Sequence, residues 1–301
     1  MLHNVSTRKE DREKVLELQE KERRCLQLWA TRTFDEEADR LTLEVLTLNP
    51  FISTVWMHRR GILGGHKGTE EELSSLVREL HITTRALEYN AKIYSVWDHR
   101  RFVIETLIGL GDDGYKKQLL HEERTFVLAT LRRDSRNFHA WNHLRLLNID
   151  MGLDTLYQLL DEDFTNHSAL HQLYLELSKD LAPNLHRALT FVRNCLMLSP
   201  DTESLWQFLL KLSKNLPDFP TLVEEILHDL EEDGCTFTCT DGMHDSYVRP
   251  PAMCLLLAAK DLLSLDSERL DQYVRLCTAR DGMRTGLYRL LFHRITTSRD
   301  H

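Results

Sequence analysis

The sequence predicts an all-α protein, a right-handed α-α superhelix in which antiparallel helical hairpins stack into a crescent. A tryptophan-centred pattern recurs at the length of one helical hairpin. Glycine and proline are scarce, and almost no segment alternates polar and apolar residues as a half-buried strand would. The 301 residues can bury a sizeable core. We predict one helical-repeat domain over residues 1–301, with about six helix pairs.

The repeat pattern is clearest in three segments, each starting with Asn or Asp seven residues before a tryptophan. They are Asn49–Leu63 (NPFISTVWMHRRGIL), Asn90–Ile104 (NAKIYSVWDHRRFVI) and Asp134–Asn148 (DSRNFHAWNHLRLLN). In each segment an arginine follows the tryptophan by four residues. These segments define clear repeats around residues 40–148.

Two weaker copies follow the clear ones. Phe164–Leu177 has Leu170 in the tryptophan position, and Ser199–Leu212 has Trp206 there. The five positions are separated by 41, 44, 29 and 36 residues, the length of a helix-turn-helix unit. We therefore expect eroded repeats over 155–215 and a C-terminal helical cap over 216–301.

The segments outside the tryptophan helices fit the same plan. Residues 8–24 are rich in charge and predict a leading helix. A capping box from Thr69 to Glu72 predicts the start of the next helix, after a glycine-rich loop. The stretch 233–250 predicts a long loop, which includes the only strand-like piece, TFTCT at 236–240.

Tryptophan and arginine four residues apart lie on one stripe of a helix. The ring can wedge against the neighbouring helix pair. The arginines have two possible roles: they stack on rings and bind carboxylates or carbonyls of the adjacent repeat, or they line a surface that meets an acidic partner. His58, His99 and His143 each follow the tryptophan by two, and we expect them to be hydrogen-bonded or at a subunit surface.

Charge and cysteine content limit the function classes. A net charge of −9 argues against a general nucleic-acid binder. Six scattered cysteines, no signal peptide and no apolar run long enough to span a bilayer predict a cytoplasmic protein. Cys235, Cys239 and His244 have only loose metal-ligand spacing, so we predict no metal site in this chain.

The repeated N-x-x-x-x-x-x-W-x-x-R-R pattern resembles the repeats of protein prenyltransferase alpha subunits over roughly residues 40–215. The third repeat reads Asp134-Ser-Arg-Asn-Phe-His-Ala-Trp141. It resembles the D-E-R-N-F-H-C-W of type II, or Rab, geranylgeranyltransferase alpha subunits. The alpha subunits shared by farnesyltransferase and type I geranylgeranyltransferase typically read D-A-K-N-Y-H-A-W. The opening MLHNVSTRKE and residues 280–294 also resemble type II subunits.

The resemblance implies a heterodimer that is inactive without its beta subunit. The beta subunit would hold the zinc, so no cofactor is expected in this chain. The implied reaction transfers geranylgeranyl from geranylgeranyl diphosphate to C-terminal cysteines of Rab GTPases, which an escort protein presents. No nucleic acid and no membrane span are implied.

The resemblance also suggests site residues. Lys92 and Arg136 match positions where family members bring a cation to the diphosphate, so both are candidate catalytic residues; the alternative is an ordinary solvated charge. The repeat-motif residues that we assign to a beta-subunit interface are Trp56, Trp97, Trp141, Arg59, Arg60, Arg100, Arg101 and Arg145.

Some positions depart from the family pattern. Leu144 replaces the first arginine of the third copy, and Leu170 and Leu173 replace Trp and Arg in the fourth. Two alternative functions therefore stay open. One is the alpha subunit of farnesyltransferase or type I geranylgeranyltransferase, and the other is a non-catalytic helical-repeat scaffold.

Overall fold

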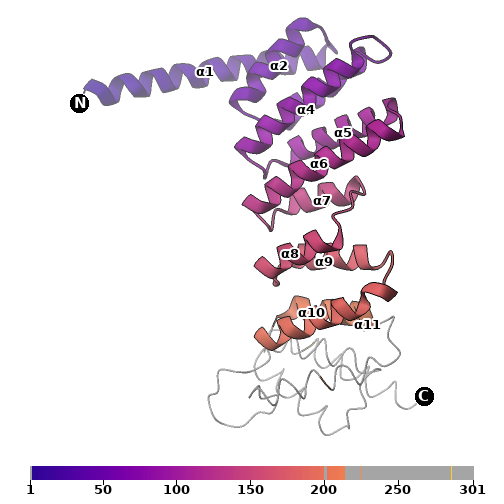
Figure 1. Cartoon of the computed structure of the whole chain (residues 1–301). Helices are drawn as coiled ribbons and strands as arrows, with labels where there is room; N and C mark the ends of the chain where they lie inside the picture. Colours follow the sequence, from indigo (N-terminus) through magenta and orange to yellow (C-terminus); the bar gives the residue numbers. More distant parts are fainter. Residues whose placement is uncertain (1, 200–201, 214–224, 226–285, 287–301) are drawn as a thin grey trace. The chain divides into compact units, whose positions relative to one another are not determined.

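The structure is a computed structural model that describes residues 2–199, 202–213, 225 and 286. These residues are helical and contain no strand (Figure 1). The helices are α1 (Leu2–Ala30), α2 (Glu36–Leu48), α3 (Ser53–Gly65), α4 (Glu72–Tyr89), α5 (Tyr94–Leu110), α6 (Asp113–Arg133), α7 (Phe138–Leu146), α8 (Leu153–Glu162), α9 (His167–Leu177), the short 3-10 helix η1 (Ala182–Asn184), α10 (Leu185–Leu198) and α11 (Glu203–Ser213).

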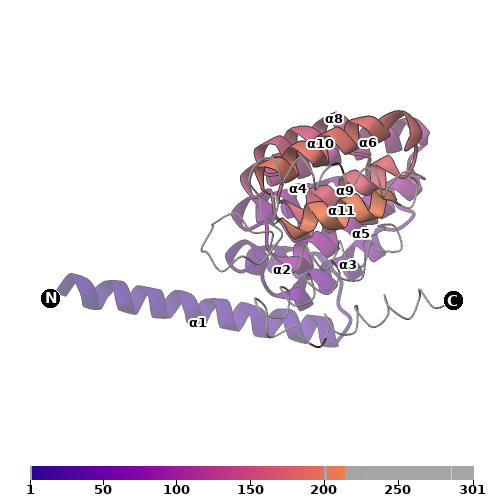
Figure 2. The ribbon, with the colours of Figure 1, turned by 90° about the horizontal axis from the view of Figure 1, so that it is seen from below.

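The predicted leading helix is part of α1, which is longer at both ends than the sequence indicated. In both views the N-terminal half of α1 projects away from α2 and α3 (Figures 1 and 2). Its C-terminal half is anchored: Cys25 and Leu28 are buried, and Lys21 forms an ion pair with Glu44 of α2 at 3.2 Å.

Five helical hairpins follow α1 within the described residues: α2–α3, α4–α5, α6–α7, α8–α9 and α10–α11. Among the described hairpins, the residue seven positions before the tryptophan, or before the residue in its place, ends the first helix as the C-cap. These residues are Asn49, Asn90, Asp134, Asp163 and Ser199. Short polar side chains suit this position because they can accept a hydrogen bond from the turn that follows.

The tryptophans close the same turns. The indole Nε1 of Trp56 donates to the Pro50 carbonyl at 2.9 Å, and Trp97 donates to Ala91 at 2.8 Å. Trp141 repeats this bond with Ser135 at 2.8 Å. The seven-residue spacing of the pattern therefore corresponds to one local arrangement. A capped helix end is followed by a turn, and the tryptophan ring donates a hydrogen bond to a carbonyl of that turn.

The start of α4 differs from the predicted capping box. The helix begins at Glu72, and the Glu72 carboxylate accepts from the Gly68 amide at 2.7 Å rather than from Thr69. The Thr69 hydroxyl donates to the His66 carbonyl at 2.7 Å and accepts from the Glu71 amide at 3.3 Å, one residue earlier than a capping box requires. Gly68, at φ 77°, provides the left-handed residue that this turn needs.

The chain divides after Asp150 into two compact units, Met1–Asp150 and Met151–His301. The first unit holds the three clear repeats, and the second holds the eroded ones. The single domain over 1–301 stays a prediction. None of the described helices combines the length and the apolar character needed to cross a membrane.

Several predictions fall on residues outside the described ranges. They concern the loop at 233–250, the helical cap at 216–301, the segment at 280–294, and the loosely spaced Cys235, Cys239 and His244.

Candidate functional site

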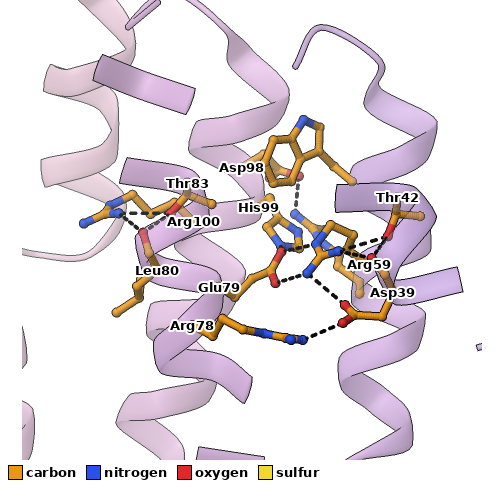
Figure 3. A network of polar contacts seen from close by, with 12 residues as sticks. Asp39, Thr42, Arg59, Arg78, Glu79, Leu80, Thr83, Asp98, His99 and Arg100 are labelled. Carbon is orange, nitrogen blue, oxygen red and sulfur yellow. Dashed lines mark hydrogen bonds and ion pairs between the residues drawn. The ribbon is translucent and has the colours of Figure 1, made fainter. Parts of the chain in front are cut away.

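The first of the paired arginines is buried where consecutive hairpins meet. We call the contact between α2–α3 and α4–α5 the first junction. There Arg59 of α3 donates from Nε and Nη2 to both carboxylate oxygens of Glu79 in α4, at 2.6 and 2.7 Å (Figure 3). Its Nη1 donates to the Thr42 hydroxyl at 2.9 Å, and Asp39 adds a second carboxylate at 3.1 Å. Arg59 is 2% exposed and Glu79 is 0% exposed.

The second junction, between α4–α5 and α6–α7, repeats this arrangement. Arg100 of α5 donates to both oxygens of Glu123 in α6, at 2.7 and 2.6 Å. Its Nη1 donates to the hydroxyls of Thr83 and Thr84, and its guanidinium stacks on the Phe126 ring at 4.1 Å. The other partners of Arg100 among the described residues are neutral, whereas Arg59 has Asp39.

Each buried glutamate also binds the histidine of its own hairpin. His99 Nε2 lies 2.9 Å from Glu79 Oε1, and His143 Nε2 lies 2.7 Å from Glu123 Oε1. His58 pairs with the Thr33 carbonyl at 2.8 Å. The expectation that these histidines are hydrogen-bonded is confirmed, and Glu79 and Glu123 each tie two hairpins together.

Trp56 and Trp97 wedge between hairpins, as expected. The Trp56 ring lies 5.0 Å from the ring of His99 in the next hairpin. Trp97 lies 5.0 Å from His143 and 6.0 Å from Phe126. Trp56, Trp97 and Trp141 are all buried. Apolar packing and the Glu–Arg–His bonds therefore occupy the same layer.

The contacts around the buried glutamates determine whether these side chains are charged. Burial raises the pKa of Glu79, but the bonds and charges of Arg59 and His99 outweigh it and hold that pKa at about 2. Glu123 also has a pKa of about 2, because Arg100 and His143 overcome its burial. Burial lowers the pKa of His99, against the opposing pull of Glu79. The glutamates are thus ionised near neutral pH.

The second arginine of each pair is more exposed. Arg60 donates to Asp98 of the next hairpin at 2.6 Å and lies over the Phe102 ring at 4.9 Å. Arg101 also pairs with Asp98, at 3.0 Å. The shared stripe is seen directly in the third repeat, where Arg145 lies 6.0 Å from the Trp141 ring; burial lowers the pKa of Arg145.

The two predicted catalytic cations lie on the turns that precede α5 and α7. Lys92 and Arg136 each stand five residues before the tryptophan of their hairpin, and both are exposed. Lys92 Nζ lies 3.4 Å from Asp134, and the Asn137 side chain donates to the Ala91 carbonyl at 3.1 Å. These contacts place the two turns side by side.

Aromatic side chains lie beside these cations. Tyr94 is 65% exposed and Phe138 is 64% exposed, and both rings approach His139, with centroids at 6.1 and 5.8 Å. We call Lys92, Tyr94, Arg136, Phe138 and His139 the turn edge. Cations and aromatic rings in this arrangement can hold an anionic group and cover an apolar chain next to it.

The structure separates the predicted interface residues into two classes. Arg59 and Arg100 are buried against carboxylates of the same chain, which favours the structural interpretation for these two. Arg60 and Arg101 are partly exposed, so an interface role for them stays a prediction. The sequence reasoning missed Glu79 and Glu123. A signal existed, because each stands 18 residues before the tryptophan of its own hairpin.

The positions that depart from the repeat pattern also differ from the clear repeats in their contacts. Leu144 and Leu173 stand in the place of the first arginine and are fully buried. Within the second unit, Gln172 takes the histidine position and donates to Glu176 at 3.1 Å. At these positions buried leucines and a neutral donor thus replace the arginine and the histidine of the first two junctions.

No group of three or more His, Cys, Asp or Glu side chains in the described part of the chain is arranged to hold a metal ion.

Comparison with known proteins gives the following matches. Residues 76–107 and 120–148 match the protein prenyltransferase alpha subunit repeat. Geranylgeranyl transferase type-2 subunit alpha of Candida albicans is 30% identical over 168 residues, 48% of this chain and 44% of that protein. The Saccharomyces cerevisiae protein of the same name is 23% identical over 248 residues, 75% of this chain and 74% of that one. The mouse protein is 26% identical over 226 residues, 68% of this chain but only 38% of its own length.

A solved structure shows the same fold. It is titled Candida albicans protein geranylgeranyltransferase-I complexed with GGPP, and the matching chain is 19% identical, with a TM-score of 0.66. The match covers 90% of this chain and 88% of that one. The predicted fold class, an all-α superhelix of prenyltransferase alpha repeats, is confirmed.

Proposed function

Since the chain belongs to the family of protein prenyltransferase alpha subunits, we propose that it is the alpha subunit of a type II, or Rab, protein geranylgeranyltransferase. The observation that carries this proposal is the common name of the related proteins, geranylgeranyl transferase type-2 subunit alpha in yeasts and mammals. Arg136 and Phe138 of the third repeat support the type II assignment. The chain spans less than half of the Candida and mouse relatives, so its substrates and partners are part of the proposal.

In the proposed reaction a Rab cysteine sulfur forms a bond to the first carbon of the geranylgeranyl group. The carbon–oxygen bond to the diphosphate breaks, and the thiol proton is lost. A beta subunit would supply the zinc, which would favour the thiolate form of the Rab cysteine. An escort protein presents the Rab GTPase, and the complex works in the cytoplasm.

The turn edge gives this chain a direct part in that reaction. As the carbon–oxygen bond breaks, negative charge grows on the leaving diphosphate. Lys92 and Arg136 are preplaced cations that can stabilise this charge. Lys92 is 74% exposed and its ion pair with Asp134 is long, at 3.4 Å, so it can exchange that partner for a phosphate oxygen. Tyr94 and Phe138 supply apolar surface beside it.

The proposal is tested by co-expression with candidate beta subunits. The purified heterodimer is assayed for geranylgeranyl transfer to a Rab with escort protein, and for farnesyl transfer to a peptide ending in a CaaX sequence. We expect the first activity, and none from this chain alone. Farnesyl transfer to the CaaX peptide would instead identify a farnesyltransferase or type I alpha subunit. Failure to bind any beta subunit would identify a non-catalytic scaffold.

A further inference from the structure

An apolar groove opens at the first junction, between the last turns of α2 and α4. Its volume is about 250 Å³. Leu43 and Leu46 of α2 line one wall, Ile82 and Ala86 of α4 line the other, and Trp56 lies at its base. Tyr89, 76% exposed, stands at the end of α4 beside it. None of these residues belongs to the turn edge.

The second junction shows why the first one is open. Phe126 stands 15 residues before Trp141, and Ile82 stands 15 residues before Trp97, so the two positions are equivalent. Phe126 packs against Trp97 with ring centroids 6.0 Å apart, whereas the smaller Ile82 lines the open groove beside Trp56, which is itself 2% exposed. Arg133 donates to the Glu88 carbonyl across the second junction at 3.4 Å; its equivalent in the first is the exposed Tyr89.

The size of the groove limits what fits. Sites for small molecules and cofactors usually measure about 300–1,000 Å³, so this groove is below that range. It suits one large apolar side chain. Protein interfaces are commonly anchored in this way, by a single aromatic or aliphatic residue that fills a pocket on the partner.

The charged residue at the groove indicates which partner group would lie next to the docked apolar side chain. Arg85 is the only charged residue among those that line the groove. It is exposed, and within the described residues it makes no hydrogen bond or ion pair. An unpaired arginine beside an apolar pocket is complementary to a carboxylate, which a guanidinium can bind with two parallel hydrogen bonds.

We propose that this groove is a docking site for a partner protein's acidic segment. One large apolar side chain of that segment enters the groove over Trp56, and a neighbouring Asp or Glu binds Arg85. The site belongs to the first two repeats and does not depend on the function proposed above.

The experiment is a selection of random twelve-residue peptides displayed on phage, using the immobilised full chain. Enriched peptides are synthesised with a fluorescent label, and their dissociation constants are measured by anisotropy. We expect peptides that share one large apolar residue flanked by Asp or Glu. The matched variant is Ile82→Phe, which places the residue of the second junction in the first. It should weaken binding at least tenfold by filling the groove.

A second variant keeps the test decisive if Ile82→Phe folds poorly. Arg85→Glu alters an exposed position and should leave the melting temperature unchanged. It should weaken the acidic peptides at least tenfold and improve versions whose acids are replaced by Lys. No enriched peptides, or equal affinity for both variants and the unchanged chain, would overturn the proposal. Self-association of the chain that Ile82→Phe abolishes would also overturn it, because the occupant would then be a second copy.

Discussion

The first and second junctions hold the same Glu–Arg–His cluster but differ in what surrounds it. At the first, Arg59 has two carboxylates, Glu79 and Asp39, and an open groove lies over Trp56. At the second, Arg100 has one carboxylate, and Phe126 packs against both Trp97 and the guanidinium. At the first junction the arginine's charge is shared between two carboxylates, and a groove stays open. At the second junction the arginine has one carboxylate, and the Phe126 ring packs against its guanidinium.

This difference shows what the repeat pattern controls. Residues that bind the neighbouring hairpin, such as Arg59 and Arg100, occupy equivalent positions in both junctions. Residues that fill the gaps, such as Ile82 and Phe126, vary from one repeat to the next. The bonding pattern therefore sets how hairpins stack, and the filling residues determine where a groove is left for another molecule.

The largest effect should come from removing a buried glutamate. Glu123→Ala leaves Arg100 buried with only neutral partners, and removing one member of a buried ion pair costs about 3–5 kcal/mol. Glu79→Ala should cost less, because Asp39 stays beside Arg59. Urea unfolding of both variants, followed by far-UV circular dichroism, measures the difference.

A matched control separates the missing charge from the missing volume. Replacing both members of a buried pair with apolar residues is often neutral, and Leu144 shows that this chain accepts leucine at the arginine position. The double variant Arg100→Leu, Glu123→Leu should recover part of the stability lost in Glu123→Ala. Equal losses for Glu79→Ala and Glu123→Ala would mean that Asp39 does not share the charge of Arg59.

Truncation of a tryptophan should have the next largest effect on stability. Truncating a buried tryptophan to alanine costs about 3–5 kcal/mol. Trp97→Ala removes contacts with His143 and Phe126 and should lie at the upper end. Trp56→Ala should lie at the lower end, because among the described residues its ring packs against one aromatic ring, that of His99, whereas Trp97 packs against two. Melting temperatures compare the two, and a smaller loss for Trp97→Ala would contradict this account of the junctions.

The fold could be predicted because its signal is periodic. The C-cap residue, the turn and the tryptophan keep their spacing through the clear repeats, so Asn49, Asn90 and Asp134 indicated hairpin boundaries before any coordinates. The start of α4 was predicted less well. The Thr69 hydroxyl accepts from the Glu71 amide, while the Glu72 amide donates to the Thr69 carbonyl, and sequence spacing alone does not reveal this shift by one residue.

Acid should weaken both junctions together. Glu79 and Glu123 have folded pKa values of about 2, below the ordinary 4.5, so their stabilisation is complete above about pH 4.5 and is lost as the pH falls toward 2. His99 has a lowered folded pKa because it is buried, so the unfolded chain binds its proton first, below about pH 6.5. Urea unfolding from pH 7 to pH 3 should show a shallow decline followed by a steep one.

The double variant Glu79→Gln, Glu123→Gln provides the check on that acid limb. Glutamine keeps the shape of the side chain but cannot titrate, so the steep decline below pH 4.5 should flatten. An unchanged steep decline would assign acid sensitivity to other carboxylates.

The candidate site was predicted only in part. Lys92 and Arg136 were proposed from the family resemblance and stay predictions, and composition could not distinguish Arg59 from Arg60, which are adjacent in the chain. Burial separates them: Arg59 faces Glu79 inside the junction, and Arg60 reaches Asp98 near the surface. The glutamate that binds the buried arginine lies 20 residues away in the sequence, so the local pattern does not reveal which arginine it pairs with.

The smallest effect on stability should come from the turn edge, where the junctions differ in one further way. The turn of the first hairpin carries Phe51 at the position of Lys92. Lys92→Ala removes an exposed side chain and should leave the melting temperature and assembly with a beta subunit unchanged. In the heterodimer it should slow single-turnover geranylgeranyl transfer about tenfold or more, because one cation is withdrawn from the leaving diphosphate.

Phe51→Ala is the control for this prediction, and a heterodimer with this variant should transfer geranylgeranyl at the normal rate. Normal transfer by Lys92→Ala would remove this lysine from the mechanism and leave the turn edge as part of the subunit contact.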